Sequence, residues 1–249
     1  MDIWTACKDA AKPGPLSGQV IRVVESLEQI ATYTLVDDLQ EQALLEEMLE
    51  TGKPPTPPEA AGLHYLLSTP FRYPPLRYGS RFGSYPEPSL FYGSTILSSA
   101  LAETAYYRFI FWSGMQESPP SGRLTTELTV FSAAYGISRG VCLQALPFSR
   151  FEVRLTNPKS YTDTQQLGAG LRKAGIEGFE YRSVRDPDGG INLGFFTAKA
   201  FSRPMPLWQQ TWICETRNET VSFYSKEQGT RLFPRKDFLV DGEMPLPAD

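Results

Sequence analysis

FRYPPLRYGSRFGSYPEPSLFYGSTILSSALAE, residues 71–103, combines a glycine-containing loop, a short strand and the first turns of a helix. Arg81 lies in the loop, Tyr92 in the strand and Glu103 in the helix, and the three residues are evenly spaced. A loop, a strand and a helix that follow one another can direct their side chains into one cleft. A cation, an aromatic hydroxyl and a carboxylate together suit a ligand that has phosphates, a flat ring and a sugar.

The sequence around this stretch mixes helical and strand patterns irregularly. We expect a strand at 90–92 and then a helix from Ser98 or Ser99 to about Trp112. Two further strands, at 124–132 and 140–146, would pair across a turn at Tyr135-Gly136. Later segments predict a helix at 163–173 and strands at 178–184, 191–197, 207–215 and 220–224. Because the order shows no regular βαβ alternation, the predicted fold class is α+β, with short hairpin-linked strands and flanking helices.

The N-terminal segment is expected to be helical. Apolar residues at helical spacing predict one helix over 17–33 and a second over 35–51, which Gly52 and Pro54 end. The acidic outer face of the second helix indicates a solvated surface or, alternatively, a docking surface for a partner. The proline-rich segment 53–62 is expected to be an extended linker.

These patterns divide the chain into three predicted parts. They are a helical segment with its linker at 1–60, a central domain at 61–205 and a hairpin extension at 206–249. We expect the first part to mediate interaction or homo-oligomerisation rather than catalysis, because none of the candidate site residues lies in it. The hydrophobic content of the whole chain, 41%, is enough to build a core.

The overall composition excludes several classes of protein. A net charge of −4 and a pI near 5.3 argue against binding to nucleic acid, which needs a basic surplus. The sequence has neither an apolar run of membrane-spanning length nor the apolar core of a signal peptide, so we expect a cytoplasmic protein without a membrane partner. The cysteines Cys7, Cys142 and Cys214 are far apart and are expected to be reduced thiols.

Common kinds of catalytic site have no signature in the sequence. His64 is the single histidine, and no close cluster of His, Cys or carboxylate residues predicts a metal site. A Ser-His-Asp or Cys-His mechanism would have to use His64, which lies in no motif of that kind. The phosphate-binding P-loop and GxGxxG sequences are also absent from the chain.

Each candidate residue has a structural interpretation beside the functional one. Arg81, flanked by glycine-containing dipeptides, can bind phosphate as a bidentate donor or can form a salt bridge. Tyr92 can stack on a flat heterocycle or can belong to the core. Glu103, among small apolar neighbours, can hydrogen-bond a ribose hydroxyl and stabilise positive charge at an anomeric carbon, or can pair with an arginine. Ser183, near two arginines, can hold a phosphate or an amide.

Three ordered blocks carry a resemblance to a known family. PFRYPPLRYGSRFG at 70–83, LFYGSTILSSALAE at 90–103 and EYRSVRDPDGGINLGFF at 180–196 resemble the RES domain family, named for its arginine, glutamate and serine. The resemblance covers roughly residues 62–200. It implies a fold similar to that of ADP-ribosyltransferases.

The resemblance also implies a set of site residues. Arg81, Tyr92, Glu103 and Ser183 correspond to the family's arginine, tyrosine, glutamate and serine. Many members have a further arginine earlier in the chain, for which Arg72 is the best candidate. This chain has a phenylalanine after Arg81 where many members have tryptophan, and it is longer at both ends than compact members. These differences leave the geometry of the partner and the choice of acceptor open.

The function implied by the resemblance is consumption of NAD. Members bind NAD as a substrate and cleave its nicotinamide–ribose bond without a metal; they are toxins of bacterial toxin–antitoxin pairs, and the usual partner is a helix-turn-helix antitoxin. The acceptor could be water, inorganic phosphate or a protein, the last of which would make the chain a protein ADP-ribosyltransferase. A catalytically inactive binding module is the third alternative. Nicotinamide leaves as a neutral molecule, so a site without histidine is compatible with this chemistry.

Overall fold

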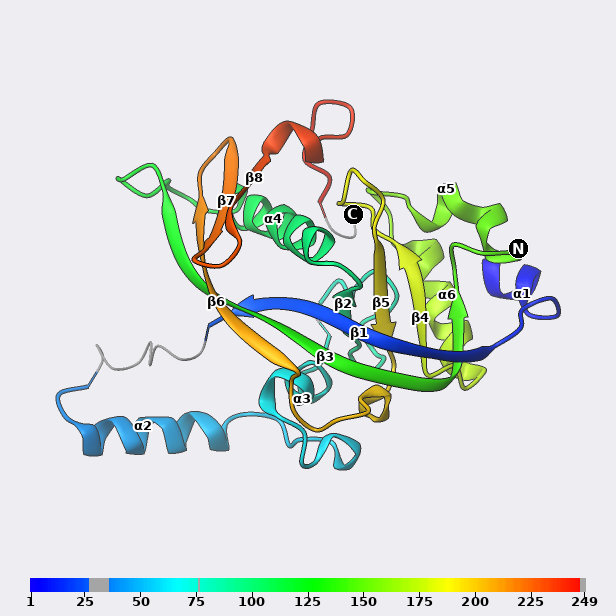
Figure 1. Cartoon of the computed structure of the whole chain (residues 1–249), viewed down its shortest axis with the longest axis horizontal. Helices are drawn as coiled ribbons and strands as arrows, with labels where there is room; N and C mark the ends of the chain where they lie inside the picture. The colour runs from blue at the N-terminus through cyan, green and yellow to red at the C-terminus, as the bar shows by residue number, and fades with distance from the viewer. Residues whose placement is uncertain (27–35, 76, 247–249) are drawn as a thin grey trace.

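The computed structural model of the chain describes residues 1–26, 36–75 and 77–246. The helices are α1 (Ile3–Cys7), α2 (Leu39–Thr51), α3 (Tyr65–Arg72), α4 (Leu97–Ser113), α5 (Glu152–Leu155) and α6 (Thr162–Lys173). The strands are β1 (Gly14–Glu25), β2 (Phe91–Ser94), β3 (Leu124–Cys142), β4 (Gly178–Arg182), β5 (Ile191–Phe195), β6 (Trp208–Thr216), β7 (Thr220–Ser225) and β8 (Gly229–Pro234). Figure 1 shows α1, α5 and α6 gathered at one end of the sheet, whereas α4 lies with β6, β7 and β8.

The strands form one mixed sheet in the order β1-β2-β5-β4-β3-β6-β7-β8. An additional antiparallel pairing joins β1 to β3, from Gly14↔Gly140 to Glu25↔Leu128. The first five strands of the order therefore close into a ring. β3 belongs to both parts of the sheet, because its C-terminal end runs parallel to β4 and its N-terminal half runs antiparallel to β6.

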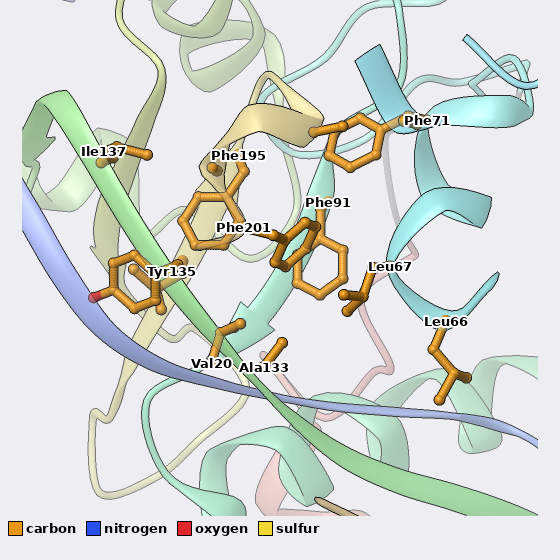
Figure 2. Packing of buried hydrophobic residues seen from close by; sticks show 14 of the residues in the cluster. Val20, Leu66, Leu67, Phe71, Phe91, Ala133, Tyr135, Ile137, Phe195 and Phe201 are labelled. Atoms are coloured by element: carbon orange, nitrogen blue, oxygen red, sulfur yellow. The ribbon is translucent and has the colours of Figure 1, made fainter. Parts of the chain in front are cut away.

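A cluster of aromatic side chains holds β2 against β5 and α3. Figure 2 shows Phe91 of β2 close to Phe195 and Phe201, with Leu67 and Phe71 of α3 nearby. The rings of Phe91 and Phe195 stack with centroids 5.8 Å apart, and Phe201 meets Phe91 edge-on at 4.9 Å. Aromatic pairs of this kind add to the stability from area burial. They hold the neighbouring positions on β2 and β5 in place.

A second cluster sets the orientation of α4. Leu101, Ala105 and Phe109 recur at every fourth position and pack with Trp212 and Phe223 of β6 and β7. A helix rotates by roughly 100° per residue, so position 103 lies on the opposite side from position 101. The packing of α4 thus directs Glu103 away from β6 and β7.

The structure confirms the α+β class and many of the expected elements. The expected helices at 98–112 and 163–173 are α4 and α6, and the helix expected over 35–51 is α2 within its described residues. The strands expected at 90–92, 178–184, 191–197, 207–215 and 220–224 are β2, β4, β5, β6 and β7.

The helix expected over 17–33 is wrong where the structure describes the chain. Residues 14–25 form β1, and residues 27–33 lie outside the described residues. The apolar positions of this segment fit both periodicities, but Val-Ile-Arg-Val-Val at 20–24 is rich in β-branched residues, which favour a strand. Pairing with β3 along most of its length decides the outcome.

The hairpin expected within 124–146 is also wrong, because 124–142 is one continuous strand. Tyr135 and Gly136, the predicted turn, instead pair with Gly18 and Ser17 of β1. Contacts with a strand far away in the sequence thus override the local turn signal of a single glycine. Strand β8 was not predicted.

The single sheet takes strands from each of the three predicted parts: β1 from 1–60, β2 to β5 from 61–205, and β6 to β8 from 206–249. The boundaries of these parts as domains stay a prediction. Within the expected linker, Pro58–Ala60 forms a 3-10 turn, and Ala60 is buried in the cluster around α3. This end of the segment is therefore packed rather than free.

Candidate active site

A cavity of about 260 Å³ brings together the polar side chains of the central stretch. Its lining includes Arg22 and Ser94 of β1 and β2, Ser80 and Arg81 of the loop before β2, and Tyr92, Glu103, Tyr107, Tyr161, Tyr181, Arg185 and Asn192. The structure therefore places Arg81, Tyr92 and Glu103 around one space. Ser183 lies against this group through Glu103.

Glu103 is held by two donors on the same oxygen. Its Oε1 accepts a hydrogen bond of 2.7 Å from the Ser183 hydroxyl and one of 2.6 Å from Asn192 Nδ2. The Ser94 hydroxyl in turn donates to Asn192 Oδ1 at 2.6 Å, which fixes the orientation of the amide. No described residue donates to Glu103 Oε2. One carboxylate oxygen is thus anchored, and the other remains for a ligand.

The hydroxyl of Ser183 is fully used within the protein. Besides donating to Glu103, it accepts hydrogen bonds from the backbone N–H groups of Arg185 at 3.2 Å and Asp186 at 3.0 Å. Ser183 is also buried, at 4% exposure. A hydroxyl with its donor and acceptor capacity taken positions its neighbour and is not available as a nucleophile.

A tight turn after β4 presents Ser183 to the carboxylate. The Asp186 carboxylate accepts hydrogen bonds from the Ser99 hydroxyl, from Asp188 N at 3.1 Å and from Gly190 N at 3.3 Å. A Cβ atom at position 190 would collide with the Ser99 hydroxyl and the Asp186 carboxylate. Glycine at 190 therefore allows the turn to pack directly on the first turn of α4.

Three arginines line the cavity, and their hydrogen bonds go to carbonyl oxygens. Arg22 donates to Tyr92 O at 3.1 Å, Arg81 to Asn157 O at 3.0 Å, and Arg185 to Pro158 O at 3.0 Å. Their guanidinium groups lie over the rings of Phe91, Tyr161 and Tyr106, respectively.

None of these three arginines forms a salt bridge within residues 1–26, 36–75 and 77–246. Carbonyl groups and aromatic rings hold the guanidinium groups in place without neutralising them. Burial lowers the pKa of Arg22 to about 10, which still leaves it protonated at neutral pH. The cavity therefore combines an uncompensated positive charge with the Glu103 carboxylate, which suits a ligand with an anionic part.

Tyr92 contributes through its hydroxyl as well as its ring. The oxygen accepts a hydrogen bond of 3.0 Å from Phe82 N and shares one of 2.8 Å with the Ser80 hydroxyl. Burial raises the pKa of Tyr92 to about 12, so the phenol stays neutral at physiological pH. Tyr92 thus connects β2 to the residues on either side of Arg81, and its predicted stacking on a ligand ring stays a prediction.

Arg72 does not line the cavity. Its guanidinium pairs with Glu50 at 2.7 Å and donates to the carbonyl oxygen of Pro54, which joins α3 to the end of α2. The arginine that the structure brings to the cavity from an earlier position is Arg22. Sequence reasoning missed it because the segment around it was interpreted as a helix.

Further lining residues also escaped the sequence reasoning. Asn192 and Ser94 lie directly opposite each other on β5 and β2, and both are buried. The available signal was a polar residue within an apolar strand, since Asn192 interrupts Ile-Asn-Leu-Gly-Phe-Phe at 191–196. The tyrosines at 107, 161 and 181 gave no signal, because aromatic residues are common in cores.

A larger cavity of about 500 Å³ lies elsewhere, between the start of β1 and the end of β3. Lys12 and Arg150 line it, but its lining contains no carboxylate and none of the predicted site residues. The cavity lined by Arg81, Tyr92 and Glu103 is therefore the candidate active site.

Residues 56–216 match the family model of the RES domain. The chain belongs to the RES domain family. The match begins within the proline-rich segment before α3 and ends with β6, so it includes the loop of Arg81, the whole of α4 and the turn of Ser183. β1, which supplies Arg22, precedes the matched part of the RES domain.

A solved structure supports the fold of the RES domain. A chain in the crystal structure of the M. tuberculosis MbcT-MbcA toxin–antitoxin complex superposes with a TM-score of 0.50 at 12% sequence identity, over 82% of this chain and 88% of that one. At this identity the likeness concerns the fold. No curated protein matches the chain significantly in sequence.

Two further observations on the described residues concern membranes and metal ions. None of their helices is both long and apolar enough to cross a membrane. They also contain no group of three or more His, Cys, Asp or Glu side chains placed to hold a metal ion.

Proposed function

We propose that this RES domain binds NAD and cleaves its nicotinamide–ribose bond. The observation that carries the proposal is the combination of three arginines, which have no carboxylate partner among the described residues, and one carboxylate, Glu103, that is anchored through a single oxygen. NAD has the complementary parts, because its pyrophosphate is anionic and its nicotinamide ribose has two hydroxyls. The family membership supports the same substrate.

The arginines would hold the pyrophosphate of NAD. Guanidinium groups bind phosphate oxygens through parallel hydrogen bonds. Arg81 has the best-defined position, because two carbonyl oxygens and the ring of Tyr161 fix its guanidinium. Holding the pyrophosphate in one place would orient the nicotinamide ribose toward Glu103.

Glu103 would act on the ribose. Its Oε2 can accept a hydrogen bond from a ribose hydroxyl, while its negative charge stabilises the oxocarbenium-like state at the anomeric carbon. The bond between that carbon and the nicotinamide nitrogen breaks, and its electron pair neutralises the pyridinium. An acceptor oxygen then bonds to the anomeric carbon and releases its proton, so neither a metal nor a histidine is required.

The size of the cavity indicates which part of NAD it would enclose. Pockets for drug-sized ligands measure roughly 300–1,000 Å³, whereas this one measures about 260 Å³. Nicotinamide and its ribose would fill it, and the adenosine half would lie along the surface. The aromatic side chains of Tyr92, Tyr107 and Tyr181 would surround the nicotinamide end.

We further propose that the chain is a toxin neutralised by an antitoxin and acts in the cytoplasm on NAD. Membership of the RES domain family and the fold shared with a chain of a toxin–antitoxin complex support this role. Water or inorganic phosphate would be the acceptor. Transfer to a protein target, which would make the chain an ADP-ribosyltransferase, is an outcome that the test below distinguishes.

The test is incubation of the purified chain with NAD labelled in the adenosine part, with and without inorganic phosphate or a cell extract. We expect release of nicotinamide together with a small labelled product, and a loss of about 10²-fold or more in rate for Glu103→Gln. Glu227→Gln, which changes an exposed carboxylate between β7 and β8, is the matched control and should leave the rate unchanged. Label that appears only on protein would indicate a protein ADP-ribosyltransferase. A folded wild-type chain that releases no nicotinamide under any condition would indicate a binding module.

A further inference from the structure

Helix α2 presents its apolar residues outward. Leu44 and Met48 are 58% and 62% exposed, and Leu39 and Leu49 are 72% and 44% exposed. The buried residue of this helix is a glutamine, Gln42, at 6% exposure. A helix that packs on its own domain normally buries its leucines and exposes its polar residues. α2 instead leaves these four apolar residues exposed and buries a glutamine.

Leu39 and Leu49 lie within roughly 60° of Gln42 around the axis of the helix, whereas Leu44 and Met48 lie on the far side. Leu44 lies roughly 200° around the helix axis from Gln42, and Met48 follows Leu44 by about one turn on the same line. Asp38 caps the N-terminus by accepting hydrogen bonds from Gln40 N at 2.7 Å and Glu41 N at 2.9 Å. Figure 1 shows α2 extending away from the sheet. The outward apolar line therefore belongs to a regular, capped helix.

Carboxylates flank this apolar line on both sides. At 100° per residue, Glu41 lies roughly 60° to one side of Leu44 and Glu47 roughly 60° to the other. The segment 37–52 carries six acidic residues and no basic one. Glu50, near its end, is paired with Lys53 and Arg72, both outside the helix. The surface is thus an apolar line between two acidic borders.

We propose that α2 is the docking surface for a basic amphipathic helix of a partner protein. Helices that associate side by side bury an apolar seam, and the charges that border the seam select the partner. Borders of glutamate select lysine and arginine. Two copies of α2 would bring like charges together, and an anionic membrane or nucleic acid would be repelled. The proposal is independent of the chemistry in the cavity, because no residue of α2 lines it.

The probe is a synthetic 18-residue helical peptide with leucine at heptad positions a and d and lysine at the flanking positions. Its affinity for the full-length protein is measured by fluorescence anisotropy at two salt concentrations, beside a peptide with glutamate in place of lysine. We expect binding of the basic peptide alone, weakened by salt. The double variant Leu44→Gln/Met48→Gln should bind at least tenfold more weakly, and Leu232→Gln, an exposed leucine of β8, should bind like the wild type.

A charge exchange completes the test. The double variant Glu41→Lys/Glu47→Lys should no longer bind the basic peptide and should bind the acidic one. This result would show that the charges beside Leu44 and Met48 select the partner. Circular dichroism and thermal unfolding check that each variant is folded. Equal affinity of the basic peptide for the wild type and for Leu44→Gln/Met48→Gln would overturn the proposal. So would a wild-type dimer in light scattering that this double variant dissociates, since a second copy would then be the occupant.

Discussion

The Ser183 hydroxyl and the Glu103 carboxylate are joined by a hydrogen bond of 2.7 Å, although 80 residues separate them in the chain. The same hydroxyl accepts two backbone N–H groups from its own turn. The turn after β4 and the second turn of α4 are thereby fixed relative to each other. This hydrogen bond holds the end of β4 and helix α4 together at the candidate site.

Ser183 should therefore act by positioning Glu103. Ser183→Ala removes one donor to the carboxylate and leaves two buried N–H groups without their acceptor, while Asn192 still holds Oε1. A hydrogen bond to a charged group contributes roughly 1.5–3 kcal/mol, so we expect kcat for NAD cleavage to fall about 10- to 100-fold with a smaller change in KM. Steady-state kinetics of nicotinamide release measure both constants.

Two variants accompany this measurement. Ser183→Thr retains a hydroxyl and should recover part of kcat if the variant folds, and Ser98→Ala, an exposed serine of α4, should have no effect. A folded Ser183→Ala protein with the kcat of the wild type would contradict the positioning role.

Arg81 should be required as an arginine. Arg81→Lys keeps the charge but lacks the planar fork that binds two phosphate oxygens and stacks on Tyr161. We expect the affinity for NAD, measured by calorimetry in a Glu103→Gln background, to fall about tenfold or more, which corresponds to about 1.4 kcal/mol. Arg72→Lys is the matched control, because Arg72 pairs with Glu50 outside the cavity. Equal affinities for arginine and lysine at position 81 would show that this residue is structural.

Tyr92 should make the free energy of unfolding decrease as the pH rises into the alkaline range. Its pKa is raised by burial to about 12 in the folded chain, whereas an unfolded tyrosine titrates near 10. The unfolded state therefore loses its proton first, and the contribution of Tyr92 to stability is present below about pH 10 and is lost as the pH rises toward 12. Tyr92→Phe should reduce the loss of stability between these two values, as measured by urea unfolding at a series of pH values.

The same variant also lacks the oxygen that accepts the hydrogen bond from Phe82 N. Leaving a buried donor unpaired costs roughly 1–3 kcal/mol, so Tyr92→Phe should also be less stable at pH 7. Tyr224→Phe, at an exposed tyrosine of β7, is the control and should match the wild type at both pH extremes. If the stability of Tyr92→Phe fell between pH 10 and pH 12 as steeply as that of the wild type, the titration of Tyr92 would not be the cause of the loss.

Expression of the chain without an antitoxin should slow growth and lower cellular NAD. Glu103→Ala removes the carboxylate that we propose stabilises the cationic transition state and should relieve both effects, whereas Glu227→Ala should not. Growth rate and NAD content at matched protein levels are the measurements. Persistent harm from Glu103→Ala would point to a mechanism other than NAD cleavage.

The local patterns of the sequence were enough to predict part of the site. Arg81, Tyr92 and Glu103 lie within one short stretch whose loop, strand and helix follow from its glycines and its apolar spacing. Such elements depend mainly on neighbours in the chain, so their order could be predicted. The helix α6 and the strands β4 to β7 were predicted for the same reason. The expected cap at Ser98 or Ser99 is wrong, because α4 begins at Leu97 after Ile96 and has no side-chain cap.

The tertiary structure alone decided which distant residues complete the site. Arg22 reaches the cavity because β1 is a strand, and β1 is a strand because it pairs with β3, more than a hundred positions later in the chain. Asn192 meets Glu103 because β5 pairs with β2 immediately before α4. Local sequence patterns carry little information about such pairings, because strand propensities depend on packing and cross-strand neighbours. The sequence by itself thus determined the α+β class and the candidate residues Arg81, Tyr92 and Glu103, and only the folded sheet decided which oxygen of Glu103 is held and which positive charges lie near it.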